Sequence, residues 1–156
     1  MPVRNEPRSL VRDGIAMQRM GGHAILVVRL GEAYLRAGRP ADALDAAEQA
    51  VRLAREHKER GHEAYALRLL GDVASQGKRS EVEKAEDFYG QAGAVSEQLG
   101  MRPLQAHCLL GSGRLYLRSG RPEPARRSLL AAEASFRTLG MPFWRRQAQE
   151  DLDSLA

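Results

Sequence analysis

The sequence predicts an all-α fold, a stack of antiparallel helix hairpins with about 8 helices. The first observation is a repeat, because segment 31–40 returns 82 positions later as segment 113–122. A weaker copy between them begins at Leu70 and Gly71, so the units are about 40 residues long, which is typical of a solenoid. The second observation is that hydrophobic residues make up 43% of the chain and aromatic residues only 5%. Packing must then rely on small side chains brought close together, which suits helix against helix.

The size and charge of the chain favour one domain that does not bind nucleic acid. The 156 residues are enough for a single continuous core, and we expect one domain over 9–156. The formal net charge is +4, and the excess of Lys and Arg lies in residues 1–60 and 101–156, whereas residues 61–100 are acidic. No aromatic stacking platform or recognised motif accompanies these charges, so they indicate solvated helix faces.

The N-terminal part carries no signal for a membrane or for export. No apolar run approaches the roughly 20 residues that span a bilayer, so we expect a cytoplasmic protein with no membrane contact. Residues 1–8 are expected to be flexible. Over 9–20 the apolar residues Leu10, Ile15, Ala16 and Met20 lie close to a 3.6-residue period, which predicts a half-repeat helix that covers the next one.

The first full unit, residues 21–60, predicts two helices over 23–37 and 40–59. Gly38 can take the left-handed conformation that ends a helix, and Pro40 suits the first turn of the next one. Gly31 lies in the middle of the first helix, where glycine costs about 1 kcal/mol relative to alanine. We therefore expect a close approach of the two helices at Gly31, opposite an alanine stripe formed by Ala43, Ala47 and Ala50.

Two further units and a final helix follow. Unit 61–100 predicts helices over 63–75 and 80–99, with Ser80 and Glu83 forming a capping box. Unit 101–140 predicts helices over 103–119 and 122–139. A capping helix over 141–155 is expected to close the stack. Its expected packing residues are Phe143, Trp144, Ala148 and Leu152, and its expected solvent-facing residues are Arg145, Arg146, Gln149, Glu150 and Asp153.

The repeat resembles the tetratricopeptide repeat (TPR) family, and the resemblance implies that the stack is a right-handed superhelix, a TPR-like α-solenoid. The residues that carry the resemblance are Leu30, Gly31, Tyr34, Ala43 and Ala50, with partial matches at Gly71, Ala74, Ala85, Tyr89, Ala92, Gly113, Tyr116 and Ala125. The period exceeds the 34 residues of that family, and Val27, Leu67 and Leu109 replace its usual aromatic residue. Longer repeats of this kind are similar to the C-terminal arrays of bacterial cyclase-like ATPase regulators and of large ATP-dependent transcriptional activators.

No pattern in the sequence indicates catalysis, a metal or a cofactor, so we expect a protein that is not an enzyme. The histidines His23, His57, His62 and His107 lack metal-pair spacing. Cys108 lies beside two leucines and is expected to be a small buried hydrophobe. The stretch 111–113, Gly-Ser-Gly, lies inside a predicted helix, where close packing explains it better than phosphate binding.

The resemblance implies that the first helix of each unit lines a concave groove that binds a partner. The positions that the family uses for ligands fall on Ile25, Val28, Glu32, Leu35 and Arg36 in the first unit, on Tyr65, Arg68, Asp72 and Ser75 in the second, and on His107, Leu110, Arg114, Leu117 and Arg118 in the third. Ordinary surface residues of a spacer are the alternative for this set. The Asn and Lys pattern with which some relatives hold a C-terminal carboxylate is absent from these positions.

Three functions remain open on the sequence alone. The first is a scaffold or regulatory module for bacterial signalling, whose groove binds a peptide or helix of a protein partner. The second is a sensor in which the groove holds a small effector and controls an attached cyclase, ATPase or transcription factor. The third is a homodimer formed through an incompletely capped N-terminal end.

Overall fold

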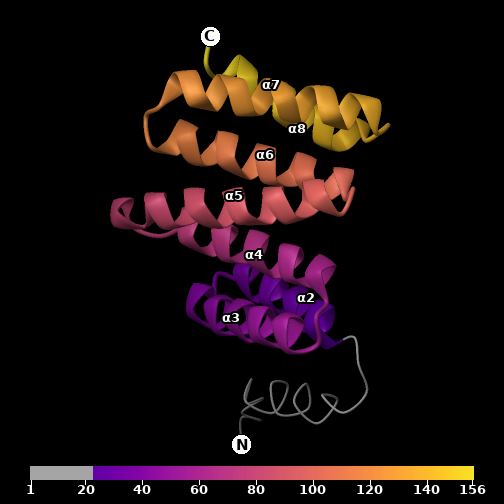
Figure 1. Ribbon diagram of the computed structural model, residues 1–156. Coiled ribbons are helices and arrows are strands. Elements are labelled where there is room, and N and C mark those ends of the chain that lie inside the picture. The colour runs from indigo at the N-terminus through magenta and orange to yellow at the C-terminus, as the bar shows by residue number, and fades with distance from the viewer. Residues whose placement is uncertain (1–22) are drawn as a thin grey trace, which may run out of the picture.

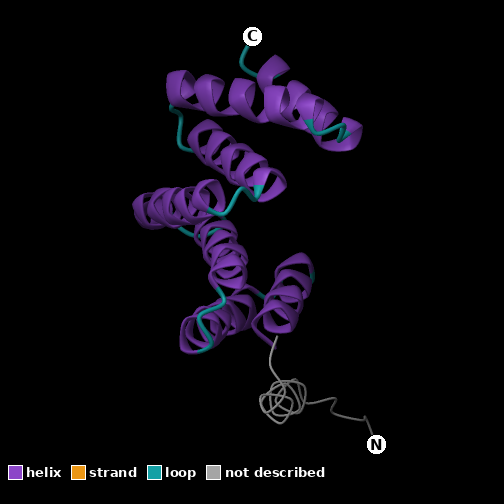
Figure 2. Ribbon diagram, turned by 45° about the vertical axis from the view of Figure 1, so that its right-hand side comes forward, coloured by secondary structure: helices purple, strands orange, loops and turns teal. Residues whose placement is uncertain are grey.

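The described part of the chain is a stack of helices joined by short connections (Figures 1 and 2). A computed structural model describes residues 23–156, and no strand occurs in this range, so the predicted all-α fold is confirmed. The helix predicted over 9–20 and the flexible start predicted over 1–8 lie outside the described residues. The elements are α2 (His23–Arg36), α3 (Pro40–Glu56), α4 (Arg60–Ser75), the 3₁₀ helix η2 (Arg79–Glu81), α5 (Val82–Gln98), α6 (Arg102–Arg118), α7 (Pro122–Thr138) and α8 (Pro142–Asp153).

The helices pack in the order of the sequence, with the N-terminal pair at one end of the stack and the C-terminal pair at the other (Figure 1). Each α-helix contacts the next one, and α2 also contacts α4, as α4 contacts α6. The helices α2, α4 and α6 therefore form one continuous side of the stack. None of the helices within residues 23–156 is both long and apolar enough to cross a lipid bilayer.

Close approach of helix backbones depends on glycine, as predicted at Gly31. A Cβ atom added to Gly31 would lie 3.3 Å from Ala46 Cβ and 3.5 Å from Ala43 O, both on α3. It would also lie only 2.5 Å from Leu69 Cδ2, on α4. Gly31 therefore lets three helices meet, whereas the sequence predicted the contact with α3 alone.

The same principle explains the predicted glycine-rich stretch of α6. The ring of Tyr89, which α5 supplies, lies between Gly71 of α4 and Gly111 of α6. A Cβ atom on Gly71 would lie 2.8 Å from the ring, and one on Gly111 would lie 2.6 Å from it. Gly113 faces Leu129 of α7, with a Cβ-to-Cγ distance of 2.6 Å. Packing thus accounts for both glycines.

Predicted helix boundaries are wrong in two places, at the connection between α3 and α4 and at the start of α5. The sequence predicts that α3 ends at residue 59 and that α4 begins at residue 63. Instead α3 ends at Glu56 and α4 begins at Arg60, with Gly61 in its first turn. The chain reverses direction at Lys58, which takes the left-handed conformation with φ of 56°. Gly100 and Gly140 take this conformation at the equivalent reversals after α5 and α7. The capping box at Ser80 is also absent, because Ser80 lies within η2 and no side chain caps the start of α5 at Val82.

Helix α8 closes the stack, with one correction to its expected packing. Ala148 and Leu152 are buried against α6 and α7, and Trp144 is partly buried there, as predicted. Phe143, however, is 54% exposed and only meets the edge of the Trp144 ring, with 5.1 Å between the ring centroids. Phe143 lies one position before Trp144, about 100° around the helix, and therefore points away from α6 and α7. The five predicted polar residues of α8 are exposed.

Candidate functional site

Two adjoining hollows lie along the side formed by α2, α4 and α6, and we call them together the groove. Their volumes are about 380 and 250 Å³. They share six lining residues, Leu35, Arg68, Asp72, Gln76, His107 and Trp144, so they form one continuous depression. The first helices of the three units supply most of its wall, and Trp144 of α8 lines both hollows.

Most of the sequence-predicted groove residues come together in this depression. They are Glu32, Leu35 and Arg36 from α2, Arg68, Asp72 and Ser75 from α4, and His107, Leu110, Arg114 and Arg118 from α6. Four others do not line it. Val28 is completely buried in the core, so its side chain cannot reach a ligand, and this placement corrects the expectation. Ile25 and Tyr65 pack against the core of α2, α3 and α4, and Leu117 packs against the core of α7 and α8.

The sequence reasoning missed six residues of the groove, and the repeat could have revealed four of them. Arg29, Leu69 and Gly111 occupy one equivalent position in the three units, spaced by 40 and 42 residues. Gln76 is equivalent to Arg36 and Arg118 in the same way. Tyr89 and Trp144 carry no such signal, because they come from the second helix of a unit and from the capping helix.

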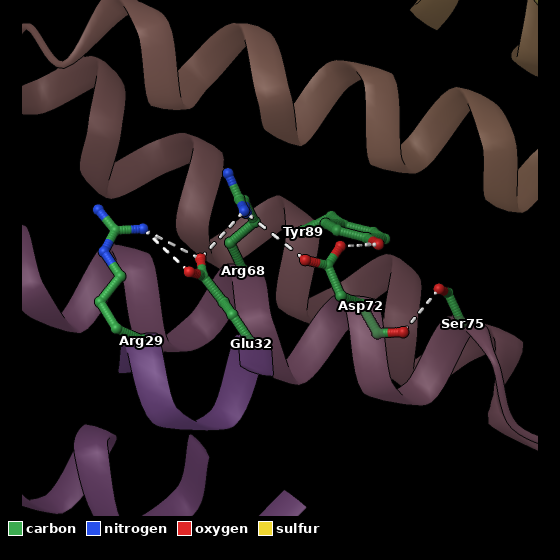
Figure 3. Close-up of polar contacts among 6 residues, drawn as sticks. All are labelled: Arg29, Glu32, Arg68, Asp72, Ser75 and Tyr89. Carbon is green, nitrogen blue, oxygen red and sulfur yellow. Dashed lines mark hydrogen bonds and ion pairs between the residues drawn. The ribbon is translucent and has the colours of Figure 1, made fainter. Parts of the chain in front are cut away.

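A chain of charged and polar contacts crosses the groove from α2 to α5 (Figure 3). Arg29 Nη1 donates to both carboxylate oxygens of Glu32, at 3.0 and 3.2 Å. Arg68 then bridges two carboxylates, with Nη2 at 3.4 Å from Glu32 Oε1 and Nε at 3.6 Å from Asp72 Oδ2. Tyr89 donates its hydroxyl proton to Asp72 Oδ1 at 2.6 Å. These contacts fix the side chains of three helices relative to one another.

Burial changes the acidity of the last pair in this chain. Desolvation raises the pKa of Asp72 above its ordinary value, although Arg68 and the hydrogen bond from Tyr89 oppose the change. Burial and the neighbouring Asp72 raise the pKa of Tyr89 as well, so its hydroxyl remains a donor at all physiological pH values. The Tyr89 hydroxyl therefore keeps its proton and holds the Asp72 side chain in place by donating a hydrogen bond to it.

The opposite wall of the groove is attached to the capping helix. Arg114 of α6 donates through Nε to Asp151 at 2.6 Å and through Nη2 to Gln147 at 3.2 Å, and both partners lie on α8. The side chain of Arg114 is still 32% exposed. These contacts hold α8 where its Trp144 reaches the groove.

His107 is uncharged at neutral pH and belongs to an aromatic cluster. Its ring meets Trp144 edge to face at 4.6 Å between centroids, and Phe136 at 5.1 Å. Burial, together with Arg68 and Arg114, lowers the pKa of His107 to about 4. The imidazole and the Trp144 ring, which lie nearly perpendicular to each other, therefore add an uncharged aromatic part to the lining between the charged side chains.

The groove has more cationic than anionic side chains. Its lining contains five arginines against two carboxylates, Glu32 and Asp72. Arg36 and Arg118 are exposed, and within the described part of the chain neither makes an ion pair or a hydrogen bond through its side chain. Unpaired guanidinium groups can bind carboxylates in bidentate fashion, so an acidic occupant fits these two positions.

The remaining chemically reactive side chains lie apart from one another. Cys108 is buried, as the sequence predicted, and burial raises the pKa of its thiol to about 12. His57 is exposed, and His62 Nδ1 lies 2.9 Å from a carboxylate oxygen of Glu59. Over residues 23–156, no group of three or more His, Cys, Asp or Glu side chains has a geometry that could hold a metal ion.

Comparison with known proteins gives no family for this chain. No family model matches it, and no curated protein matches its sequence significantly. The site must therefore be interpreted from its own geometry.

Proposed function

We propose that this protein is a non-enzymatic interaction module whose groove binds a peptide or a helix of a protein partner. The observation that carries the proposal is the composition of the groove, which combines the aromatic side chain of Trp144 with the unpaired arginines Arg36 and Arg118. Aromatic and arginine side chains supply most of the binding energy at protein interfaces. A segment with apolar anchors and carboxylates fits this arrangement best.

The shape of the groove also favours an extended or helical segment. The lining passes from α2 over α4 and α6 to α8, so an occupant contacts several helices at once. Arg36 and Arg118 occupy equivalent positions at the ends of α2 and α6. Two carboxylates separated along one segment would therefore be bound by two units of the repeat, which would fix the position of the segment along the groove.

Charge reversal at the two unpaired arginines tests the proposal. After affinity capture of a partner, its binding constant is measured for the wild type, for Arg36→Glu, for Arg118→Glu and for the control Arg52→Glu. Arg52 is an exposed arginine of α3 that lies outside the groove and has no ion pair within residues 23–156. Each groove variant should weaken binding about tenfold or more, because one charged contact contributes roughly 1.5–3 kcal/mol. Equal binding by all four proteins would refute the groove as the binding site.

Within a cell, we place this module in the regulatory or scaffolding part of a signalling system. The proposal rests on the resemblance of the repeat to the long arrays of bacterial regulators. A partner that carries a catalytic or DNA-binding domain would support this assignment. Capture of partners unrelated to signalling, from the organism that encodes the chain, would contradict it.

One observation favours a second candidate function, an effector sensor. The larger hollow, of about 380 Å³, falls within the range of small-molecule pockets, which is about 300–1,000 Å³. A small acid could bind the arginines there and bridge α2, α4 and α6. A screen of nucleotides and acidic metabolites by thermal shift tests this candidate, because a ligand at 100 times its Kd stabilises a protein by about 2.7 kcal/mol. Unchanged Tm values across the screen would eliminate it.

A further inference from the structure

Helix α2 exposes apolar side chains at positions whose equivalents on α4 and α6 are mostly buried. Leu26, Leu30 and Ala33 follow one another at helical spacing along one side of α2, which we call the α2 face. Leu26 is 51% exposed, Ala33 is exposed and Leu30 is half-buried.

The equivalent residues of the next two units are mostly buried. Forty positions later, Ala66, Leu70 and Val73 of α4 are each less than 9% exposed. On α6, 82 positions after Leu26 and Ala33, Cys108 and Leu115 are at most 3% exposed, and only Ser112 is half-buried. The α2 face is therefore a surface that this repeat elsewhere uses for packing.

The element that covers this side is the second helix of the preceding unit. A Cβ atom on Gly93 of α5 would lie 4.0 Å from Cys108 Cβ, so Cys108 faces α5. Leu115 belongs to a buried cluster that includes Ala85 and Tyr89 of α5. In the same way α4 packs against α3. By this equivalence, the α2 face is the position on α2 that corresponds to the α5-covered side of α6.

A buried hydroxyl leads to the same conclusion. Tyr116 of α6 donates its hydroxyl proton to Glu86 of α5 at 2.7 Å, across the junction between two units. Tyr34 occupies the equivalent position on α2 and is 7% exposed. Its hydroxyl is buried and has no hydrogen-bond partner within the described residues. Such a group costs about 1–3 kcal/mol unless an acceptor satisfies it, and on α6 that acceptor comes from the preceding helix.

We propose that residues 9–20 of this same chain bind to the α2 face. Segment 9–20 has 12 residues, as many as helix α8, and only Gly21 and Gly22 join it to the start of α2. Within this segment, Leu10, Ile15, Ala16 and Met20 form the predicted apolar stripe. A segment joined directly to α2 also has an effective concentration in the millimolar range, which favours it over a second molecule.

Hydrogen exchange of the full chain tests this proposal, with Leu26→Asp as the perturbing variant and Leu130→Asp as its control. Leu130 is 52% exposed and lies on α7, far along the sequence from the α2 face, so the two substitutions are matched in exposure. In the wild type, the amides of residues 9–20 should exchange at least tenfold more slowly than an unstructured peptide of that sequence. Leu26→Asp should abolish this protection, and Leu130→Asp should retain it.

The same experiment separates the alternatives. Amides within α4 to α7 report whether each variant is folded, so a loss of protection limited to residues 9–20 cannot be confused with unfolding. Ile15→Asp, which changes the other side of the contact, should have the same effect as Leu26→Asp. Free exchange of residues 9–20 in the wild type would overturn the proposal. A dimer in light scattering that Leu26→Asp dissociates would also overturn it and assign the α2 face to a second copy.

Discussion

Replacement of Gly111 by alanine tests whether glycine is needed where the helices meet. The ring of Tyr89 is confined there, because a Cβ on Gly111 would lie 2.6 Å from Tyr89 Cε1 and one on Gly71 would lie 2.8 Å from the same atom. The hydroxyl is bound to Asp72 at 2.6 Å, and Tyr89 is only 3% exposed. The ring therefore cannot move aside without losing contacts on its other side.

The expected magnitude follows from two opposing terms. Alanine is about 1 kcal/mol more favourable than glycine in a helix interior. Overpacking of a buried contact costs typically about 1–3 kcal/mol. Gly90 of α5 is the matched control, since nothing lies within 4 Å of a Cβ at that position. Gly90→Ala should raise the free energy of unfolding by about 1 kcal/mol, and Gly111→Ala should leave it about 1–3 kcal/mol below that of the control.

Urea denaturation followed by circular dichroism measures both values with the wild type as reference. The slope of the transition should stay the same in the three proteins, because the surface exposed on unfolding does not change. If Gly111→Ala stabilised the protein as much as Gly90→Ala does, the packing argument for the glycines would be refuted.

Three further predictions concern single side chains. The pKa of His107 is about 4 in the folded protein and about 6.5 when unfolded, so the unfolded chain binds the proton first as the pH falls. The free energy of unfolding should therefore fall by up to about 3 kcal/mol as the pH drops from about 6.5 to 4. His107→Gln should flatten this dependence on pH. The thiol of Cys108, with a pKa of about 12, should react with a thiol reagent only after denaturation; rapid modification of the native protein would contradict its burial. Trp144→Ala should destabilise the protein by about 3 kcal/mol because it empties the cluster with Phe136 and His107, whereas Phe143→Ala should change stability by less than about 0.5 kcal/mol in the same urea assay.

The repeat predicted much of the fold, because the residues that let helices touch are small and recur at a fixed spacing. Gly31, Gly71 and Gly113 identified the packing positions, and all three face a neighbouring helix. Helix ends were harder to predict. Lys58 takes a left-handed conformation that is uncommon for a lysine, so the sequence does not mark the turn there and predicts the start of α4 three residues too late.

The site could be predicted only where the repeat carries it. Arg36 and Arg118 occupy equivalent positions of the repeat and both line the groove. Gln76 occupies the same position in the unit between them and lines it as well. The position of Trp144 depends on how α8 packs on α7 and α6, which includes the contact of Arg114 with Asp151 between residues 37 positions apart. No periodicity reports a contact of that kind.

The binding role of the groove can be tested directly by photo-crosslinking to the captured partner. A photoreactive phenylalanine analogue replaces Gln76, which lines both hollows, or Leu130, which is exposed outside them. The analogue at position 76 should form crosslinks to the partner efficiently, and the analogue at position 130 should form none. Crosslinks from position 130 with none from position 76 would contradict a partner bound in the groove.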